Sequence, residues 1–483
     1  MQYVSTRGAQ PGKTFSDILF EGYAPDNGLY VPESYPQVSR QDLSLMRSLS
    51  FDGVLFHILS LFWPEAPREA LWTVCREAAD PSKFSHGRGP EDVGPTEDPA
   101  PIQWLNDGVA LFKLANGPTL AFDDFGMSLL ALLFKKRIPG CPKEITLVGA
   151  TSGDMGASCE AAFAGVAGAK IAMLAPKGRL TSFQDAQLYS CAAPNVLNIE
   201  VDGSFDNCQD LVELMLKDAD FKRANQLGAI NTVLWARVAV QIACYFYAYS
   251  RVAEHAGDEV VFTVPCGNFG NAFAGWVAKQ MGLPILRLIV ATNENDAMDR
   301  FMRTGVYEPA LDGRTVATSS PSSDISRAAN FERFLFEGLG RDGARTAALI
   351  AELHQKGRIE LTKDEFARLR RSRITSGASA HVNRLEIIER AHVADGVLID
   401  PHTADCLYAG IYLHPVGVPT ICFETSAPAK APDLIYEATR QRVPTPAGYE
   451  DLFERPKKKT PAPADLAAVK AIVAGFAKSG AAA

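Results

Sequence analysis

Two adjacent carboxylates, Asp123 and Asp124, stand in the stretch GPTLAFDDFGMSLL at residues 117–130. An ionised carboxylate can accept a proton or hold a cation, but it has no nitrogen with which to form an imine. Two interpretations stay open. One of the two residues is the N-cap of a helix that begins at Phe125, or Asp123 projects into a cleft as a general base or an orienting charge. Adjacent helical residues diverge by about 100°, so the pair need not share a proton.

A second candidate site is the sequence PCGNFGN at residues 265–271, called the glycine loop below. Its two glycines bracket Asn268 and Phe269, so the backbone can approach a ligand closely and present several N–H groups to phosphate oxygens. The loop follows an apolar strand and precedes an apolar helix. That context favours a phosphate cradle over an ordinary turn.

The third candidate is GATSGD at residues 149–154, called the hydroxyl turn below. It offers small residues, two hydroxyls and backbone N–H groups at a helix N-terminus, which suits an anion. An ordinary turn with Ser or Asp as the N-cap explains the same residues equally well.

Strands that alternate with single helices position these three stretches. Apolar strands are predicted at 145–150, 170–175, 195–201, 260–265 and 285–293, each followed by a helix or a turn, which argues for parallel sheet with right-handed crossovers. The helix that follows residue 232 is apolar nearly all round and should lie between layers. Because ligands bind at the carboxyl edge of open parallel sheets, the three stretches are expected to form one site.

The same pattern divides the chain into six parts. We expect a small helical N-terminal region at 1–82, a Gly- and Pro-rich linker at 83–102 and the α/β domains with the active-site cleft at 103–320. A helical insertion at 321–395 and the rest of the large α/β domain at 396–454, with strands at 397–401 and 419–425, should follow. Residues 455–483 should form a tether with a terminal helix that docks or hangs free.

Composition excludes several classes of function. The 483 residues are 47% hydrophobic and carry a net charge of −8, with one short basic run at 457–459, so nucleic acid is not an expected partner. The start has no signal-like pattern and no apolar run reaches a membrane span, which predicts a cytoplasmic protein that does not bind membranes. Nine scattered cysteines without a CxxC pair indicate reduced thiols, and no metal site is expected.

Many segments, in order along nearly the whole chain, resemble the threonine synthase family. They include VSTRG, GPTLAF, GATSGD, FDNCQDLV, VPCGNFGNAFAG, LIDPHTA and TSAPAK. The resemblance implies the fold type II architecture of pyridoxal-phosphate (PLP) enzymes, similar to the tryptophan synthase β chain, with two open α/β domains, parallel-rich sheets and a small N-terminal helical region. The family reaction converts O-phosphohomoserine and water into threonine and phosphate on PLP.

The resemblance also assigns roles to individual residues. The PLP-phosphate loop is matched by Gly267, Asn268, Phe269, Gly270 and Asn271, and Thr425 matches a position near the pyridine ring. The substrate-binding set that the resemblance implies comprises Asn116, Thr119, Thr151, Ser152, Asp154, Asn231 and Arg237.

Three departures from the family pattern lie at positions that the resemblance places near the reacting atoms. Asp123 stands where the family has the lysine that forms the PLP imine, and Asn116 and Ala427 stand where the family commonly has histidine. Covalent PLP attachment at Asp123 is chemically excluded, and three coordinated changes suggest natural repurposing.

The leading hypothesis is a PLP-independent lyase or cyclase without a covalently bound cofactor. It would release phosphate from a small phosphorylated, amino-acid-like substrate with Asp123 as the base. One alternative is a threonine synthase that holds PLP non-covalently or has an inactivated site. The other is a non-catalytic pseudoenzyme that binds a phosphorylated metabolite or a partner protein. Family members are monomers or dimers, and both states stay open.

Overall fold

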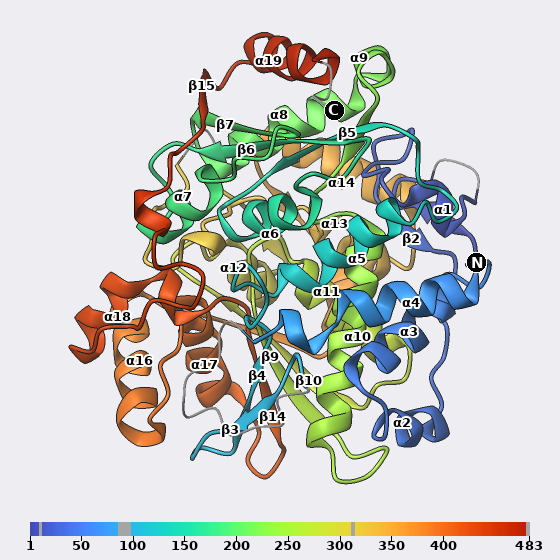
Figure 1. Ribbon diagram of the computed structural model, residues 1–483. Helices are drawn as coiled ribbons and strands as arrows, with labels where there is room; N and C mark the ends of the chain where they lie inside the picture. Colours follow the sequence, from blue (N-terminus) through green and yellow to red (C-terminus); the bar gives the residue numbers. More distant parts are fainter. Residues whose placement is uncertain (9–11, 86–97, 311–313, 480–483) are drawn as a thin grey trace.

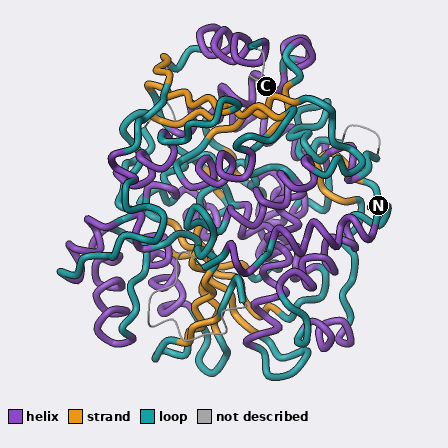
Figure 2. The backbone as a smooth tube through the Cα atoms, in the orientation of Figure 1, coloured by secondary structure: helices purple, strands orange, loops and turns teal. Residues whose placement is uncertain are grey.

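The computed structural model describes residues 1–8, 12–85, 98–310 and 314–479 (Figure 1). Most of the expected linker, residues 86–97, lies outside this described part. The tube in Figure 2 shows two groups of strands, an upper and a lower one, with helices between and around them. Each group is one parallel-rich sheet, so the expected α/β class is observed.

The N-terminal region is mainly helical and carries a short antiparallel strand pair. Tyr3 of that pair is fully buried, and its hydroxyl donates to the Phe62 carbonyl at 2.9 Å, which ties the pair to the helices. The elements are β1 (Tyr3–Ser5), α1 (Phe15–Ile18), β2 (Tyr30–Pro32), α2 (Arg40–Met46), α3 (Phe51–Phe62), α4 (Arg68–Ala78) and η1 (Pro81–Lys83).

The upper sheet has five strands in the order β15-β7-β6-β5-β8, all paired in parallel. Its strands are β5 (Ile145–Ala150), β6 (Ala169–Pro176), β7 (Val196–Asp202), β8 (Leu227–Ala229) and β15 (Thr460–Pro463). The helices that follow or connect them are α6 (Asp154–Phe163), α7 (Ser182–Tyr189), α8 (Phe205–Lys217) and α9 (Ala219–Ala224).

The lower sheet has six strands in the order β13-β10-β9-β14-β4-β3, parallel except for the β3/β4 hairpin. Its strands are β3 (Ile102–Trp104), β4 (Val109–Lys113), β9 (Val260–Pro265), β10 (Ile285–Thr292), β13 (Ile374–Ala378) and β14 (Thr420–Glu424). The helices that pack on this sheet or on one another around it are α5 (Asp123–Lys135), α10 (Trp235–Val252), α11 (Gly270–Gln280), α12 (Ala297–Thr304), α16 (His381–Asp395), α17 (Pro401–Leu413) and α18 (Pro432–Thr439).

Helix α10 is buried as its composition predicts, since every residue in it except Gln241 and Arg251 is buried. It packs against α3, α5 and α11 and lies beside the lower sheet in Figure 1. The contact with α5 fixes the side chains of its first turns relative to the start of that helix. Arg237 is one of them.

The expected helical insertion at 321–395 also contains strands. β13 adds an edge to the lower sheet by pairing with β10, and β11 (Val306–Tyr307) pairs with β12 (Ile359–Glu360). The helical elements of this stretch before α16 are η2 (Pro321–Ser323), α13 (Phe331–Gly338), α14 (Gly343–Lys356) and α15 (Lys363–Arg370).

The strand predicted at 397–401 is not formed. Asp400 instead caps helix α17, and its side chain accepts from the backbone N–H groups of His402 and Thr403. An N-cap with Pro at the first helical position is a strong helix start, and it outweighs the β-propensity of the apolar residues before it.

The tail is not a free tether. After η3 (Pro428–Lys430) and η4 (Leu452–Glu454), the strand β15 joins the upper sheet beside β7, and the helix α19 (Leu466–Lys478) lies against α8 at the top of Figure 1. Val469 and Val473 of α19 are fully buried, and Lys170 donates to the Ala477 carbonyl at 2.7 Å. The terminal helix therefore docks.

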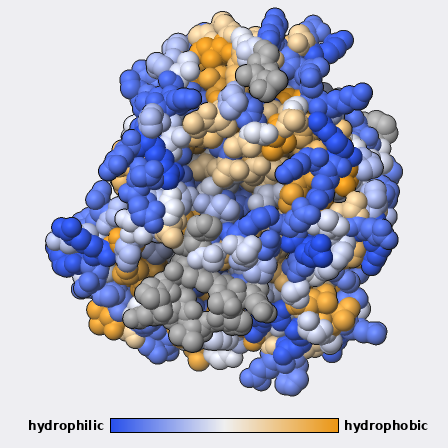
Figure 3. All heavy atoms as spheres, viewed as in Figure 1, coloured by the Kyte–Doolittle hydropathy of each residue, from blue (hydrophilic) through white to orange (hydrophobic). Residues whose placement is uncertain are grey.

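The surface is mixed in polarity. On the face in Figure 3, hydrophilic residues dominate the rim and hydrophobic ones gather toward the upper middle. In the described part of the chain, no helix combines the length and apolar character that crossing a membrane needs. All nine cysteines lie in the described part and none forms a disulfide.

Candidate active site

A cavity, called the main cavity below, lies where the carboxyl ends of β5, β9 and β14 meet the start of α5. It is concave and is lined by both apolar and polar side chains, as small-molecule sites usually are. Its wall contains all five predicted residues of the glycine loop, the predicted residues of the hydroxyl turn, and Asp123, Arg237 and Thr425. The fold thus brings most of the predicted residues together from segments about 300 positions apart.

Neither aspartate is the N-cap of α5, contrary to the first interpretation. The helix begins at Asp123, the N-cap is Phe122, and no side chain caps it. The Asp124 carboxylate instead accepts from the backbone N–H and the hydroxyl of Thr119, at 2.9 and 2.5 Å. Asp124 therefore fixes the turn before the helix, while Asp123 is left to line the main cavity.

Asp123 is paired with Arg237, a buried residue in the first turn of α10. The guanidinium Nη2 donates to Oδ1 of Asp123. Burial raises the pKa of Asp123 to about 6, against the opposing effect of Arg237. A carboxylate with such a pKa can accept or release a proton near neutral pH, as a general base must.

The glycine loop has the geometry of an anion site. Phe269 adopts the left-handed conformation, with φ of 59°, directly before α11, and the helix starts at Gly270. The side chain of Asn271 is buried and neither its Oδ1 nor its Nδ2 has a hydrogen-bond partner in the described part of the chain. Because buried amides are normally paired, this amide is available to a ligand that enters the cavity.

Close packing explains the glycines of this loop. A Cβ at Gly267 would lie 3.0 Å from the Ile325 side chain, and one at Gly270 would lie 3.2 Å from Asn330. The backbone of the loop therefore packs directly against neighbouring residues. Since glycine has no side chain, a ligand can approach the N–H groups of the loop closely.

The hydroxyl turn is held by its own side chains. The Thr151 hydroxyl accepts from the N–H groups of Gly153 and Gly156, at 2.9 and 2.8 Å. Asp154 is buried and forms an ion pair with Lys430, whose Nζ lies 2.8 Å from Oδ1. Although burial acts the other way, Lys430 and His402 hold the pKa of Asp154 below its usual value. Asp154 is therefore a fixed negative charge in the wall.

Three predicted substrate residues do not line the main cavity. The Asn116 amide donates to the Lys113 carbonyl at 3.0 Å, and the Thr119 hydroxyl is occupied by Asp124 and Ser158. Asn231 lies in a smaller adjoining pocket, where its Oδ1 accepts from the N–H of Val233 at 3.2 Å. The hydrogen bonds of these side chains hold the turns that shape the site, although Oδ1 of Asn116 has no partner among the described residues.

His402 and Ser322 are two wall residues that were not among the predicted site residues. His402 lines the main cavity, its Nδ1 lies 2.7 Å from Asp400 Oδ1, and its Nε2 accepts from the N–H of Ser322 at 3.1 Å. Although burial opposes it, Asp400 raises the pKa of His402. The sequence signal was the DPHTA run, in which a capping aspartate precedes a histidine by two residues.

Ser322 joins the two halves of the site. Its hydroxyl accepts from Gln184 at 3.0 Å and donates to Asp154 at 3.3 Å, while its N–H reaches His402 on the other side. Nothing in the run SSPSSD marks one serine as special, since its role depends on side chains that only the fold brings to it.

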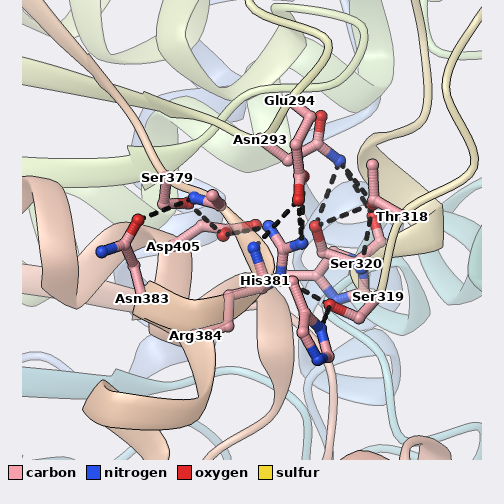
Figure 4. A network of polar contacts seen from close by, with 12 residues as sticks. Asn293, Glu294, Thr318, Ser319, Ser320, Ser379, His381, Asn383, Arg384 and Asp405 are labelled. Carbon is pink, nitrogen blue, oxygen red and sulfur yellow. Dashed lines mark hydrogen bonds and ion pairs between the residues drawn. The ribbon is translucent and has the colours of Figure 1, made fainter.

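A buried polar network anchors residues 318–320, which directly precede the segment that contains Ser322 (Figure 4). Asn293, which follows β10, donates to the hydroxyls of Thr318 and Ser320 at 3.0 and 3.1 Å. Arg384 on α16 is fully buried and contacts Ser319 at 2.7 Å. The segment is thereby anchored on the lower-sheet side while it lines the main cavity.

Arg384 is also the charge centre of this network. Its guanidinium bonds to both carboxylate oxygens of Glu294, at 2.7 and 2.9 Å, and to Asp405 at 3.1 Å. Burial raises the pKa of Asp405 to about 6 despite this contact. The network therefore depends on one cation that two carboxylates share.

Comparison with known proteins assigns this fold and site to a family. Residues 2–79 match the model of the threonine synthase N terminus, residues 102–361 that of pyridoxal-phosphate dependent enzymes, and residues 403–473 that of the threonine synthase C-terminal region. A threonine synthase of Methylobacillus glycogenes is 42% identical over 98% of this chain and 99% of its own. The chain belongs to the threonine synthase family.

Solved structures of this family superpose on nearly the whole chain. A PLP-bound threonine synthase from Brucella melitensis is 35% identical, has a TM-score of 0.86, and is matched over 99% of this chain and 100% of its own. Threonine synthase from yeast is 30% identical, with a TM-score of 0.83 and 98% of each chain covered. The expected fold type II architecture is confirmed, and the chain is a threonine synthase-like member of a PLP-dependent enzyme family.

These matches overturn the expected absence of a covalently bound cofactor. The segment that matches PLP-dependent enzymes contains both Asp123 and the glycine loop, and the Brucella relative is a PLP-bound protein. The expectation was wrong because it rested on one side chain. Asp123 excludes an imine only at its own position, whereas the glycine loop and Thr425 do not depend on that residue.

Proposed function

We propose that this protein binds PLP in the main cavity and acts on a small phosphorylated amino acid of the O-phosphohomoserine type, from which phosphate is released. The observation that carries the proposal is the glycine loop at the start of α11, with the unpartnered amide of Asn271, in the same cavity wall as Thr425 and the hydroxyl turn. Threonine synthases that cover nearly the whole chain support the substrate class.

The residues present fit the cofactor's phosphate and ring. Backbone N–H groups of the glycine loop and the Asn271 amide would hold the phosphate, and Thr425 would face the pyridine ring. When bound, PLP supplies an electron sink for carbanions next to an amino group. Asp123 would then take a proton as the general base, and a group in that role typically contributes about 10²- to 10⁴-fold.

A covalent link to the cofactor requires an amine at another position than 123. The side chain of Lys430 is only 3% exposed. Its Nζ forms an ion pair with Asp154, which lines the cavity wall, so this amine lies beside the cavity. We expect borohydride reduction of the PLP-treated protein, followed by peptide mass spectrometry, to place the pyridoxyl group on Lys430. Reduction without any modified lysine would contradict this expectation even if PLP binds.

The proposal predicts that Asn271→Ala weakens PLP binding by roughly 10- to 100-fold, because a hydrogen bond to a charged ligand contributes about 1.5–3 kcal/mol. PLP titration followed by absorbance and tryptophan fluorescence measures the dissociation constant. Asn198→Ala is the matched control, since Asn198 is also a buried amide with an unpartnered Oδ1 but lies in β7 and does not line the cavity. Equal affinities of the Asn271 variant and the unmodified protein would contradict the phosphate role.

Phosphate release from O-phosphohomoserine in the presence of PLP tests the reaction itself. Release that Asp123→Ala abolishes supports the proposal. If PLP and O-phosphohomoserine both bind but no phosphate is released, the proposed reaction is wrong. Only the proposed binding of the two molecules is then supported.

A further inference from the structure

Asp123 has one carboxylate oxygen to spare. Its Oδ1 accepts from Arg237, whereas Oδ2 forms no hydrogen bond with the described residues. Oδ2 is not completely enclosed by protein atoms, and Asp123 lines the main cavity. A free, cavity-facing carboxylate oxygen is an acceptor for a cationic or N–H-bearing group of a ligand.

Arg237 has a spare donor beside it. Its Nη2 holds Asp123, but Nη1 is buried and has no hydrogen-bond partner in the described part of the chain. Arg237 itself belongs to the cavity wall and is only 2% exposed. An unmatched buried guanidinium N–H is costly unless a ligand's anionic or carbonyl oxygen completes it.

The charge balance around Asp123 favours an additional cation. Four charged groups act on its carboxylate: Arg237 from α10, Asp154 from α6, Asp124 from α5 and Lys430 from η3. Burial outweighs the two cations, and the pKa of Asp123 is raised to about 6. The ionised carboxylate is therefore short of positive charge, and an ammonium group at Oδ2 would supply it.

We infer that Asp123 and Arg237 together form the seat for a zwitterionic α-amino acid substrate, with Asp123 Oδ2 receiving the ammonium group and Arg237 Nη1 an anionic group of the same molecule. The pair itself is neutral, so it matches a ligand part that carries both charges. This inference rests on the proposed function and specifies how the same cavity recognises its substrate.

The assignment gives the departure at position 123 a function of its own. A lysine there would repel an incoming ammonium group, whereas a carboxylate attracts it. Asp123 would act first as a recognition group, and its raised pKa lets it accept one proton from the bound ammonium, which leaves a neutral amine with a free electron pair. The carboxylate gains the proton that the nitrogen loses, so no further reactant is needed.

Calorimetric titration with O-phospho-L-homoserine and with its des-amino analogue, in which hydrogen replaces the amino group, tests the seat. At pH 8 we expect the amino-bearing ligand to bind at least about tenfold tighter. In Asp123→Asn the ratio should fall below about twofold. Arg237→Gln should weaken both ligands by a similar factor, because both carry the anionic groups.

Asp124→Asn is the matched control. Asp124 is the neighbouring buried carboxylate on the same helix, but it bonds to Thr119 and does not line the main cavity. This variant should keep the tenfold ratio. A loss of the ratio in this variant as well would show that the general charge of the region, and not the Oδ2 seat, selects the amine.

The pH dependence of the unmodified protein provides a test that needs no variant. Between pH 8 and pH 5 Asp123 becomes protonated, so the ratio of the two affinities should fall toward one. The phosphate of the ligand titrates in the same range, but it is common to both ligands and cancels in the ratio.

The outcomes separate this inference from the proposed function. Equal binding of the two ligands at pH 8 would overturn the ammonium seat and leave the proposed function standing. Failure of both ligands to bind, with or without PLP, would remove the proposed function. A ratio that persists in Asp123→Asn would assign amine recognition to another residue and overturn the inference.

Discussion

The variant Asp123→Lys is expected to form a reducible imine with PLP at position 123 and to convert O-phosphohomoserine at least about 100-fold faster than the unmodified chain. The cavity wall already contains the glycine loop and Thr425, so the change places an amine at position 123 of a wall that is otherwise assembled. Absorbance of the protein–PLP complex and peptide mass spectrometry after borohydride reduction measure the link.

The surroundings of residue 123 favour reactivity of the introduced amine. The position is 6% exposed and lies beside Arg237, so burial and a neighbouring cation would both lower the pKa of the introduced amine. A lysine with a lowered pKa is partly neutral near pH 7, and the neutral amine is the nucleophile. The same change removes the ammonium seat, so the affinity ratio of the two amino-acid ligands should be lost.

Two controls accompany this variant. Asp123→Asn removes the negative charge without adding an amine and should gain neither imine nor activity. Asp124→Lys places the same amine one residue further along, away from the cavity wall, and should not be labelled at that position. If the peptide that contains residue 123 carries no pyridoxyl group in Asp123→Lys, position 123 does not face the cofactor.

The variant Arg384→Met is expected to lower the free energy of unfolding by about 3–5 kcal/mol, the usual cost of leaving a buried charge without its partner. Arg384 is fully buried and is shared by Glu294 and Asp405 in the network of Figure 4. Asp405 is 2% exposed, and its Oδ2 has no partner among the described residues. Urea denaturation followed by circular dichroism measures the change.

The double variant Arg384→Met, Asp405→Asn tests the cause. Because the second substitution removes the buried carboxylate charge, it should restore part of the lost stability, whereas a pure packing defect would not be relieved. The single variant should also lose more stability at pH 8 than at pH 5. Without Arg384 the pKa of Asp405 rises above its present value of about 6, so protonation at pH 5 removes the uncompensated charge. A loss below about 1 kcal/mol would contradict the central role of Arg384.

The sequence predicted correctly those features that depend on local order along the chain. The apolar strands that alternate with helices form two parallel-rich sheets, and α10 is buried as its composition predicts. The errors came from competing local signals. Asp400 and Pro401 start a helix where the apolar run suggested a strand, and the Pro-rich tail pairs with β7 because an open sheet edge accepts it.

By itself the sequence determined the family, the type of fold and the residue types of the site, including the carboxyl group at position 123 that cannot form an imine. These follow from covalent chemistry and from the periodicity of the chain. Only the tertiary structure decided which carboxylate faces the cavity, that Arg237 leaves one oxygen of Asp123 free, and that His402 and Ser322 complete the wall. Such contacts join residues up to several hundred positions apart, and their geometry is set by the packing of two sheets on one buried helical layer, which no local pattern encodes.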